Sequence, residues 1–379
     1  MTGGEWRNED RGTGADGARA IIAGVPTPAS ALARPQSATS AGMTRKLRIA
    51  SLAILIGLAA AAGAWALWWH VAAGRLAQSI DLWIAAREAE GYRIEAARAP
   101  IEGFPFHLRT KIAAPALAAG DGSWSWSGPA LAIEAPAWSP LRIEFAMPGA
   151  HRVSTRDHRY EVQAAAAGGV LVLATDGRLD RLALTASGIT AQEPQRPPAT
   201  IASLRALLGQ PAPDPAAPVA PSLTFDLAAE TIALPPDPRL ALGPAIDRLI
   251  LTGRLEGPPP RGLDAASLGA WRDAGGAVDV DLAAIAWGPL KLSGSGTFSL
   301  DEALRPIAAA SAEVQGATET LGAVANAGLM KPDDARLAAL GLALLADAQG
   351  RVKVPLTAQD GELSAGPIKL AQLPPVVQP

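Results

Sequence analysis

The sequence predicts a mainly β protein, with one N-terminal transmembrane helix and its stalk followed by curved antiparallel sheets and a few short helices. Three observations support this fold class. A long apolar run lies near the N-terminus, apolar and polar residues alternate in many later stretches, and 38 Gly and 33 Pro residues are spread along the chain. Frequent Gly and Pro indicate many short elements separated by turns rather than a few long helices.

Composition argues against several classes of function. The 33 basic and 36 acidic residues nearly balance, whereas nucleic-acid-binding domains usually carry a strong basic excess. The chain has no Cys, which excludes disulfides, thiolate nucleophiles and Cys-ligated metal sites. The sequence also lacks a glycine loop for phosphate or dinucleotide binding. We therefore expect no cofactor.

The first segment, residues 1–42, is rich in Gly, Ala, Arg, Thr and Ser and has no sustained apolar periodicity. Such a composition is typical of a disordered segment or of one that is not part of the natural product. Met43 is a candidate start codon.

Residues 43–74 are predicted to form a transmembrane signal anchor. The uncharged apolar run over residues 49–71 measures roughly 35 Å as a helix at about 1.5 Å per residue, which spans a bilayer. A cleaved signal peptide is the alternative, because small residues inside the run offer a cleavage site. The run continues to Trp65, Trp68 and Trp69, which resemble an interfacial belt and favour an uncleaved membrane anchor.

The basic residues Arg45, Lys46 and Arg48 place the N-terminus in the cytoplasm by the positive-inside rule. The protein is therefore expected in the bacterial inner membrane as a single-pass protein with a periplasmic body. Residues 75–91 continue outward as an amphipathic stalk helix that ends at Gly91.

After the stalk the apolar period changes to two. In FPFHLRTKI the apolar residues alternate with His107, Arg109 and Lys111, which is the pattern of a half-buried strand. Strands with one apolar side are usually antiparallel. The alternating apolar residues are Phe104, Phe106, Leu108 and Ile112, then Trp124 and Trp126, then Leu223, Phe225 and Leu227, and finally Val278, Val280 and Leu282.

Stretches with apolar residues at helical spacing are fewer than the alternating stretches. Helical spacing occurs over residues 199–208, 263–274 and 318–346, and the last stretch is broken near Lys331.

Clustered prolines divide the β body. They lie on both sides of residue 215 and predict long connections there. We therefore expect a first β half over residues 92–215 and a second β half with helices over residues 216–379.

A similar phrase occurs three times, as AWSPLRIEF, AWGPLKLSG and SAGPIKLAQ. In each, a proline (Pro140, Pro289 or Pro367) precedes a branched, a basic and another branched residue. Because Pro lacks a backbone donor and fits the first residue of a strand, each phrase predicts a strand opening at a sheet rim, where Trp138 and Trp287 pack. The unequal spacing excludes a solenoid of fixed period and suggests two related β halves with a closing strand. Chance recurrence is the alternative, chiefly for the third copy.

Several of these motifs carry a family resemblance. WIAAREAEGYRIE, IEGFPFHLRTKIAAPAL and WSWSGPALAIEAPAWSPLRIEFAMPG follow the anchor in that order. In this the chain resembles the DUF2125 family of alphaproteobacterial membrane-anchored proteins, over nearly everything after Met43, and the family implies no catalytic residues. The stretches LKLSGSGTFSLDEALRPIAAASAEVQG and RVKVPLTAQDGELSAGPIKLAQLPP are similar to segments of AsmA-like envelope proteins, whose curved antiparallel sheets imply lipid or envelope homeostasis by analogy of fold.

Of the four histidines, His70 is expected at the membrane interface and His107 on the polar face of a strand, and His151 and His158 lack the spacing of a metal site. Two of them lie in HRVSTRDHRY, which is expected to be a solvated turn. Binding of an anionic headgroup is the alternative for this segment.

Asp279 and Asp281 place two carboxylates on one strand face. Paired acids occur in glycosidases, but such a pair is usually the wet side of a strand. We therefore expect no enzymatic activity.

The leading hypothesis is a membrane-anchored periplasmic envelope protein that binds or handles lipid through an apolar groove of its curved sheet. Ala-rich strands leave volume that favours such a groove. A non-enzymatic interaction scaffold of an envelope membrane complex is the alternative, and a hydrolase of cell-wall glycans requires two carboxylates that converge in a cleft. Expected partners are the membrane, a lipid or fatty-acyl ligand and an envelope protein. The predicted groove lining, for which ordinary core packing is the alternative, is Phe104, Phe106, Leu108, Trp124, Trp126, Leu223, Phe225 and Leu227.

Overall fold

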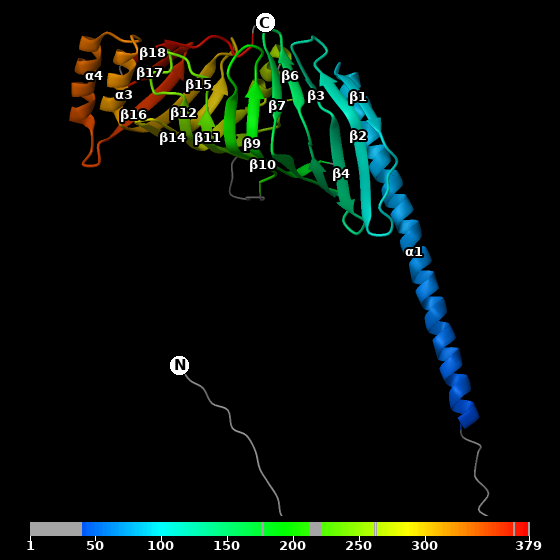
Figure 1. Ribbon diagram of the computed structural model, residues 1–379. Helices are drawn as coiled ribbons and strands as arrows, with labels where there is room; N and C mark the ends of the chain where they lie inside the picture. The colour runs from blue at the N-terminus through cyan, green and yellow to red at the C-terminus, as the bar shows by residue number, and fades with distance from the viewer. Residues whose placement is uncertain are drawn as a thin grey trace, which may run out of the picture. The chain divides into compact units, whose positions relative to one another are not determined.

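The computed structural model describes residues 40–175, 178–211, 221–260, 262, 264–366 and 368–377 (Figure 1). The predicted N-terminal extension lies outside these residues up to residue 39. The predicted division near residue 215 and Pro367 of the third repeated phrase also lie outside them.

One long helix, α1 (Ser40–Ala89), contains both the predicted anchor and the predicted stalk. Among the described residues it alone is long and apolar enough to cross a membrane, over Arg45–Ala89. The chain divides into two compact units after Ala61, so the part of α1 from Ala62 onward belongs to the β body. Gly91 follows the helix at φ 94°, in the left-handed region that glycine enters easily and that commonly ends helices.

The described part of the β body contains one antiparallel sheet of 18 strands, which confirms the predicted fold class. The strands are β1 (Arg93–Arg98), β2 (His107–Ala118), β3 (Trp124–Ser127), β4 (Ala130–Pro136), β5 (Arg142–Ala146), β6 (His151–Thr155), β7 (Arg159–Gln163), β8 (Ala166–Leu173), β9 (Leu179–Gln192), β10 (Ala199–Gly209), β11 (Pro221–Ala233), β12 (Ala245–Glu256), β13 (Ala277–Trp287), β14 (Leu290–Leu300), β15 (Pro306–Gln315), β16 (Arg351–Gln359), β17 (Glu362–Ala365) and β18 (Ile368–Gln372).

The sheet is a meander in which each strand from β9 to β18 pairs with the next along the chain. Between the long strands β2 and β9 it divides into two tracks of short strands. One track is β3, β6 and β7, and the other is β4, β5 and β8. Because β2 and β9 pair with both tracks, the sheet stays continuous.

Three short helices interrupt the meander: α2 (Ala265–Asp273), α3 (Ala317–Asn326) and α4 (Pro332–Leu345). They confirm the helices predicted over residues 263–274 and 318–346, including the break near Lys331. In Figure 1, α3 and α4 lie beside β16–β18, at the end of the sheet remote from β1 and β2.

The helix predicted over residues 199–208 is wrong, because these residues form β10. This strand pairs with β9 on one side and with β11 on the other. The two ladders override the helical spacing of Ile201, Leu204 and Leu208, since tertiary pairing outweighs a weak local preference.

The strand predicted from Phe104 begins only at His107. Phe104 and Phe106 lie in the preceding turn, and both are more than half exposed. From His107 onward the predicted alternation holds, with Leu108 and Ile112 buried.

A bulge interrupts the predicted alternation of β13. The register shifts so that Val280 lies opposite Gly253 and Leu282 lies opposite Thr252. Because Thr252 and Gly253 point to opposite faces, Leu282 is on the other face from Val280.

Strands follow the repeated phrase as predicted. β5 begins two residues after Pro140, and β14 begins one residue after Pro289. Each of these prolines therefore lies in the turn before the strand rather than in its first position. Trp287 ends β13, and its indole N–H donates to the Gly243 carbonyl at 2.8 Å.

The stalk part of α1 packs on the sheet at its β1–β5 end. Trp69, Ala72 and Leu76 form a buried cluster with Leu108 of β2 and Ala135 of β4. Both sheet residues are 0% exposed. The apolar side of the stalk is therefore part of the core of the β body.

Candidate functional site

One face of the sheet is apolar across most of its width, and we call it the apolar face. Residues directly opposite one another on paired strands share a face. The register therefore joins one residue from each of twelve strands (β2, β4, β5 and β8–β16) into a continuous row. Only the first residue of this row is polar. The row is Thr110, Ile133, Phe145, Gly169, Leu184, Ala206, Leu227, Leu251, Ala283, Gly294, Ala312 and Val354.

The ends of the apolar face are more deeply buried than its middle. The stalk covers Leu108 at one end, and at the other end Val352 is 2% exposed. Between them most apolar side chains of this face on β8–β12 are only half-buried, and Leu249 is 39% exposed, although Ala229 opposite it is buried. Exposed apolar surface of this extent is typical of a binding site.

Four residues of the predicted groove lining lie on the apolar face. Leu223, Phe225 and Leu227 lie on β11 in its half-buried middle, opposite Leu255, Gly253 and Leu251 of β12. Leu108 lies on β2 under the stalk, so it is separated from the other three.

The remaining predicted lining residues lie elsewhere. Trp124 and Trp126 share one side of β3, where Trp126 stacks on His151 with ring centroids 5.7 Å apart. Phe104 and Phe106 lie in the turn before β2, beside α1. The structure therefore brings three of the eight predicted residues together on the half-buried part of the sheet.

The three predicted anchor tryptophans join α1 to the sheet, and we call this contact the tryptophan clasp. The indole N–H groups of Trp65, Trp68 and Trp69 each donate to a backbone carbonyl at 2.9 Å. The acceptors are the carbonyls of Pro105, Ala137 and His107, in that order. The predicted role of these tryptophans at the membrane surface stays a prediction.

A groove of about 730 Å³ lies between the stalk and the sheet, and we call it the stalk groove. One wall is a single face of α1 from Trp68 to Leu82, and the other is formed by the turn before β5 and the end of β8. Ile143 lines this groove and also lies opposite Leu171 on the apolar face. The stalk groove and the apolar face therefore meet at Ile143.

Among the described residues, Arg75 is the only charged one that lines the stalk groove. It is exposed, and within the described part of the chain it forms no ion pair. A cation without an ion-pair partner among the described residues, beside an apolar groove, suits a ligand with an apolar chain and an anionic head.

A hollow of about 930 Å³ crosses strands β2 to β11. Its lining takes residues from both faces, such as Ile133 and Phe145 of the apolar face, but its charged residues lie on the opposite face. Small residues such as Ala132, Ala146, Gly168 and Ala228 line its floor. Short side chains leave volume between longer ones, as expected for Ala-rich strands. This hollow contains none of the predicted groove residues.

The charges around this hollow are paired with one another. Glu134 contacts Arg109 at 2.9 Å and His107 at 2.6 Å. The hydrogen bond from Arg109, together with its charge, lowers the pKa of the Glu134 carboxyl. A general acid for glycoside hydrolysis needs a raised pKa, so Glu134 does not fit that role.

The two carboxylates of β13 share one arginine. Arg254 pairs with Asp279, and it contacts Asp281 at 3.5 Å and Glu256 at 3.2 Å. The hydrogen bond to Asp279 raises the pKa of Arg254. This arrangement is an ion-pair network on the wet side of a strand.

The segment HRVSTRDHRY forms β6, a turn and the start of β7. His158 and Arg196 both contact Glu193, at 2.9 and 3.0 Å, and Arg156 contacts Asp121 at 3.2 Å. Because His158 and Arg156 already contact carboxylates, they are less suited than unpaired cations to bind an anionic headgroup.

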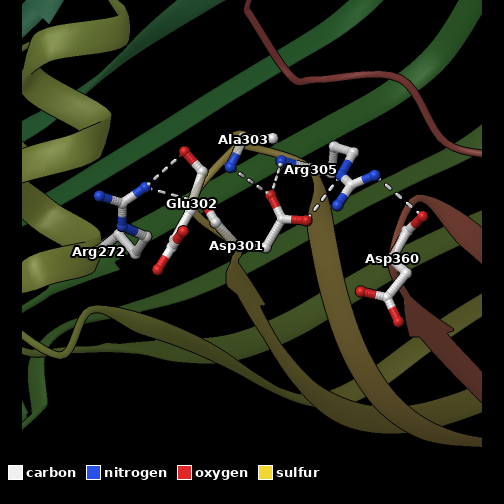
Figure 2. A network of polar contacts seen from close by, with 6 residues as sticks. All are labelled: Arg272, Asp301, Glu302, Ala303, Arg305 and Asp360. Atoms are coloured by element: carbon white, nitrogen blue, oxygen red, sulfur yellow. Dashed lines mark hydrogen bonds and ion pairs between the residues drawn. The ribbon is translucent and has the colours of Figure 1, made fainter.

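A polar network ties α2 to two turns at the far end of the sheet (Figure 2). Arg272 donates to the carbonyls of Asp301 and Glu302, at 3.0 Å each. Asp301 accepts from the side chain and backbone of Arg305 at 2.7 and 2.8 Å, and Arg305 in turn donates to the Asp360 carbonyl at 3.0 Å. Figure 2 shows these groups converging between the β14–β15 and β16–β17 turns.

Sequence reasoning missed the stalk groove. Its helical wall has a signal in the sequence, because Trp68, Val71, Arg75 and Leu82 recur at helical spacing. Its other wall comes from turns near Leu141 and Leu173, whose approach to the stalk depends on strand pairing. No local pattern of the sequence reports that approach.

Comparison with protein families gives one match, to the family described as "Uncharacterized protein conserved in bacteria (DUF2125)", over residues 69–374. The comparisons with curated proteins and with solved structures find no match. The likeness of the later segments to AsmA-like proteins stays a prediction.

Proposed function

Because the chain belongs to the DUF2125 family of bacterial proteins, we propose that it is a membrane-anchored envelope protein that binds or handles lipid on the apolar face of its sheet. The observation that carries this proposal is the row from β2 to β16, which is half-buried over β8–β12. Each methylene group that leaves water on such a surface contributes about 0.8 kcal/mol. An acyl chain is a fitting occupant of an apolar strip of this length.

We also propose that the β body is periplasmic. The basic residues before the apolar run support this orientation. Since the chain has no Cys, a single cysteine can report the side of the membrane. Glu319→Cys on the exposed surface of α3 should react with a membrane-impermeant maleimide in spheroplasts, and Arg45→Cys should react only after permeabilisation. The reverse pattern would reverse the orientation.

The proposed function is non-enzymatic. Glu134, Asp279 and Asp281 all contact cations, which supports a structural role for these carboxylates rather than an acid–base role.

Native mass spectrometry with lipid extraction tests the lipid proposal. The β body should be expressed from Ala62, where the compact unit begins. We expect near-stoichiometric phospholipid or fatty acid on the unmodified body, less on Leu227→Asn, and an unchanged amount on the matched control Ala228→Asn. Residues 227 and 228 are neighbours on opposite faces of β11. A lipid-free mass for a folded body would overturn the proposal.

One observation favours the scaffold alternative. Helix α4 exposes Leu337, Leu340 and Leu344 at 69%, 66% and 88%, and their spacing places them on one helical side. A row of exposed leucines at the end of the sheet suits a protein contact. Under this alternative, Leu340→Lys combined with Leu344→Lys should release a partner or lower the oligomeric state of the full chain, measured by light scattering and affinity purification.

A further inference from the structure

Three exposed aromatic rings lie around the tryptophan clasp. Phe104, Phe106 and Trp138 are 55%, 57% and 62% exposed. The Phe104 ring lies 5.6 Å from that of Trp69, and the Trp138 ring lies 6.4 Å from that of His107. We call these three residues the aromatic rim. They belong to the turns whose carbonyls receive the indole hydrogen bonds.

The predicted membrane span would place this rim at the surface of the bilayer. Trp65 and Trp69 fall in the last part of the apolar run over residues 49–71, so the turns bound to them lie where the run leaves the bilayer. Exposed aromatic rings are unfavourable in water but suit the interface between lipid tails and headgroups.

The stalk groove begins at the same level. Trp68 and Val71 line it and are the last part of the apolar run, and Trp138 belongs to both the groove and the rim. From Trp68 to Leu82 the groove follows α1 for roughly 21 Å at about 1.5 Å per residue. Arg75 lies one helical turn beyond the run, where phosphate groups are found.

We propose that the stalk groove accepts one acyl chain of an anionic phospholipid directly from the membrane, with Arg75 holding the phosphate. This inference rests on the proposed function, because the groove then delivers the chain to the apolar face at Ile143. The geometry provides a mostly apolar wall on each side, one end at Trp68 and Val71 of the apolar run, and a cation that has no carboxylate partner among the described residues. Arg75 is a binding residue in this account, since a guanidinium pairs with phosphate oxygens in two hydrogen bonds.

Site-specific photo-crosslinking tests the inference on the full chain in nanodiscs of phosphatidylglycerol and phosphatidylethanolamine. p-Benzoylphenylalanine replaces Leu173, which lines the groove, or Val172, which does not. We expect a phospholipid adduct at position 173 about tenfold above that at position 172. Arg75→Gln should lower the phosphatidylglycerol adduct several-fold, and Arg75→Lys should largely restore it.

Two further variants distinguish lipid in the groove from contact with bulk lipid. Ser79→Trp fills the groove from the exposed side of α1, and Thr175→Trp fills it from the other wall, so either should abolish the adduct at position 173. No adduct at position 173, or an adduct that survives both fillings, would overturn the inference.

The outcome for the groove is separable from that for the apolar face. Lipid found on the β body by native mass spectrometry, without an adduct at position 173, would leave the proposed function standing and remove the groove as its access route. An adduct at position 173 with a lipid-free β body would support the groove and contradict the proposed function.

Discussion

At the scale of single residues, two glycines explain how the apolar face carries phenylalanine rings. Phe145 lies opposite Gly169, and Phe225 lies opposite Gly253. A Cβ at either glycine would lie 2.8 Å from the Cζ atom of its phenylalanine. The same Cβ would lie even closer to a backbone carbonyl of the neighbouring strand, that of Ala183 at Gly169 and that of Asp279 at Gly253. Each ring therefore covers a glycine, and the ring and the adjacent backbone together exclude a side chain there.

Gly253→Ala should therefore destabilise the β body, by about 1–3 kcal/mol as is typical of overpacking. The matched control is Gly341→Ala on α4, where a Cβ meets nothing within 4 Å. Removing a helical glycine should instead stabilise by up to about 1 kcal/mol. Urea unfolding of the body from Ala62 measures both, and equal effects of the two variants would contradict the packing account.

At the scale of elements, the tryptophan clasp makes the start of the stalk part of the β body. Trp69 is 5% exposed and belongs to the buried cluster, whereas Trp68 is 42% exposed. Both donate one hydrogen bond to the sheet. Trp69 and Trp68 therefore differ in how much of the indole ring is buried.

Trp69→Phe should lower the free energy of unfolding by about 1–3 kcal/mol, because it leaves the His107 carbonyl without its donor and opens space in the core. Trp68→Phe should cost less, since Trp68 is 42% exposed and lies outside the buried cluster. Thermal unfolding of the full chain in detergent compares them. A larger loss for Trp68→Phe would show that the clasp is not anchored through Trp69.

The network in Figure 2 gives the far end of the sheet a dependence on pH. Burial alone would raise the pKa of Asp301, but hydrogen bonds from the backbone and side chain of Arg305 outweigh it, so the pKa is lowered. A lowered folded-state pKa stabilises the fold above the unfolded value of about 3.9, and this contribution is lost as pH falls through the folded value.

Asp301→Asn should therefore destabilise the body at pH 7, by about 1–3 kcal/mol, and the loss should be smaller at pH 3, which lies below the unfolded value of about 3.9. The matched control is Asp360→Asn, because only the backbone carbonyl of Asp360 joins the network and Asn tolerates its positive φ. Urea unfolding at the two pH values tests this. An equal loss for Asp301→Asn at both values would contradict the assigned ionic role.

At the scale of the whole molecule, the β body begins inside the long helix rather than after it. The compact unit starts at Ala62, and the cluster under the stalk needs Trp69 and Ala72. A chain that begins at Arg75 lacks both residues and all three indole hydrogen bonds.

The body from Ala62 should therefore unfold cooperatively at a clearly higher temperature than the chain from Arg75. Removing several buried side chains, at about 2–5 kcal/mol each, consumes much of the stability of a typical domain. Circular dichroism during heating measures both proteins. Equal melting temperatures would show that the stalk contributes little to the fold.

The sequence predicts the fold class well because its signals are local. The alternation around Leu108 and around Phe225 follows the pleat of single strands, and the apolar run over residues 49–71 is visible without any partner. The helix predicted over residues 199–208 was wrong because these residues form β10, which pairs with β9 and β11. A short stretch of sequence around residues 199–208 does not contain these partner strands. The stalk groove escaped for the same reason, since its walls are far apart in the chain. The turn that holds Phe104 and Phe106 continues the alternation of β2 by chance, and the strand begins only where pairing with β4 begins.

The central claim is that lipid lies on one face of the sheet, and β11 offers the most direct test. p-Benzoylphenylalanine should be placed at Leu227 or at Ala228 in the full chain, in membranes, and irradiated. The account predicts a phospholipid adduct at position 227 and none above background at position 228, because the two side chains point to opposite faces. Equal adducts at both positions, or none at position 227 in a folded protein, would contradict it.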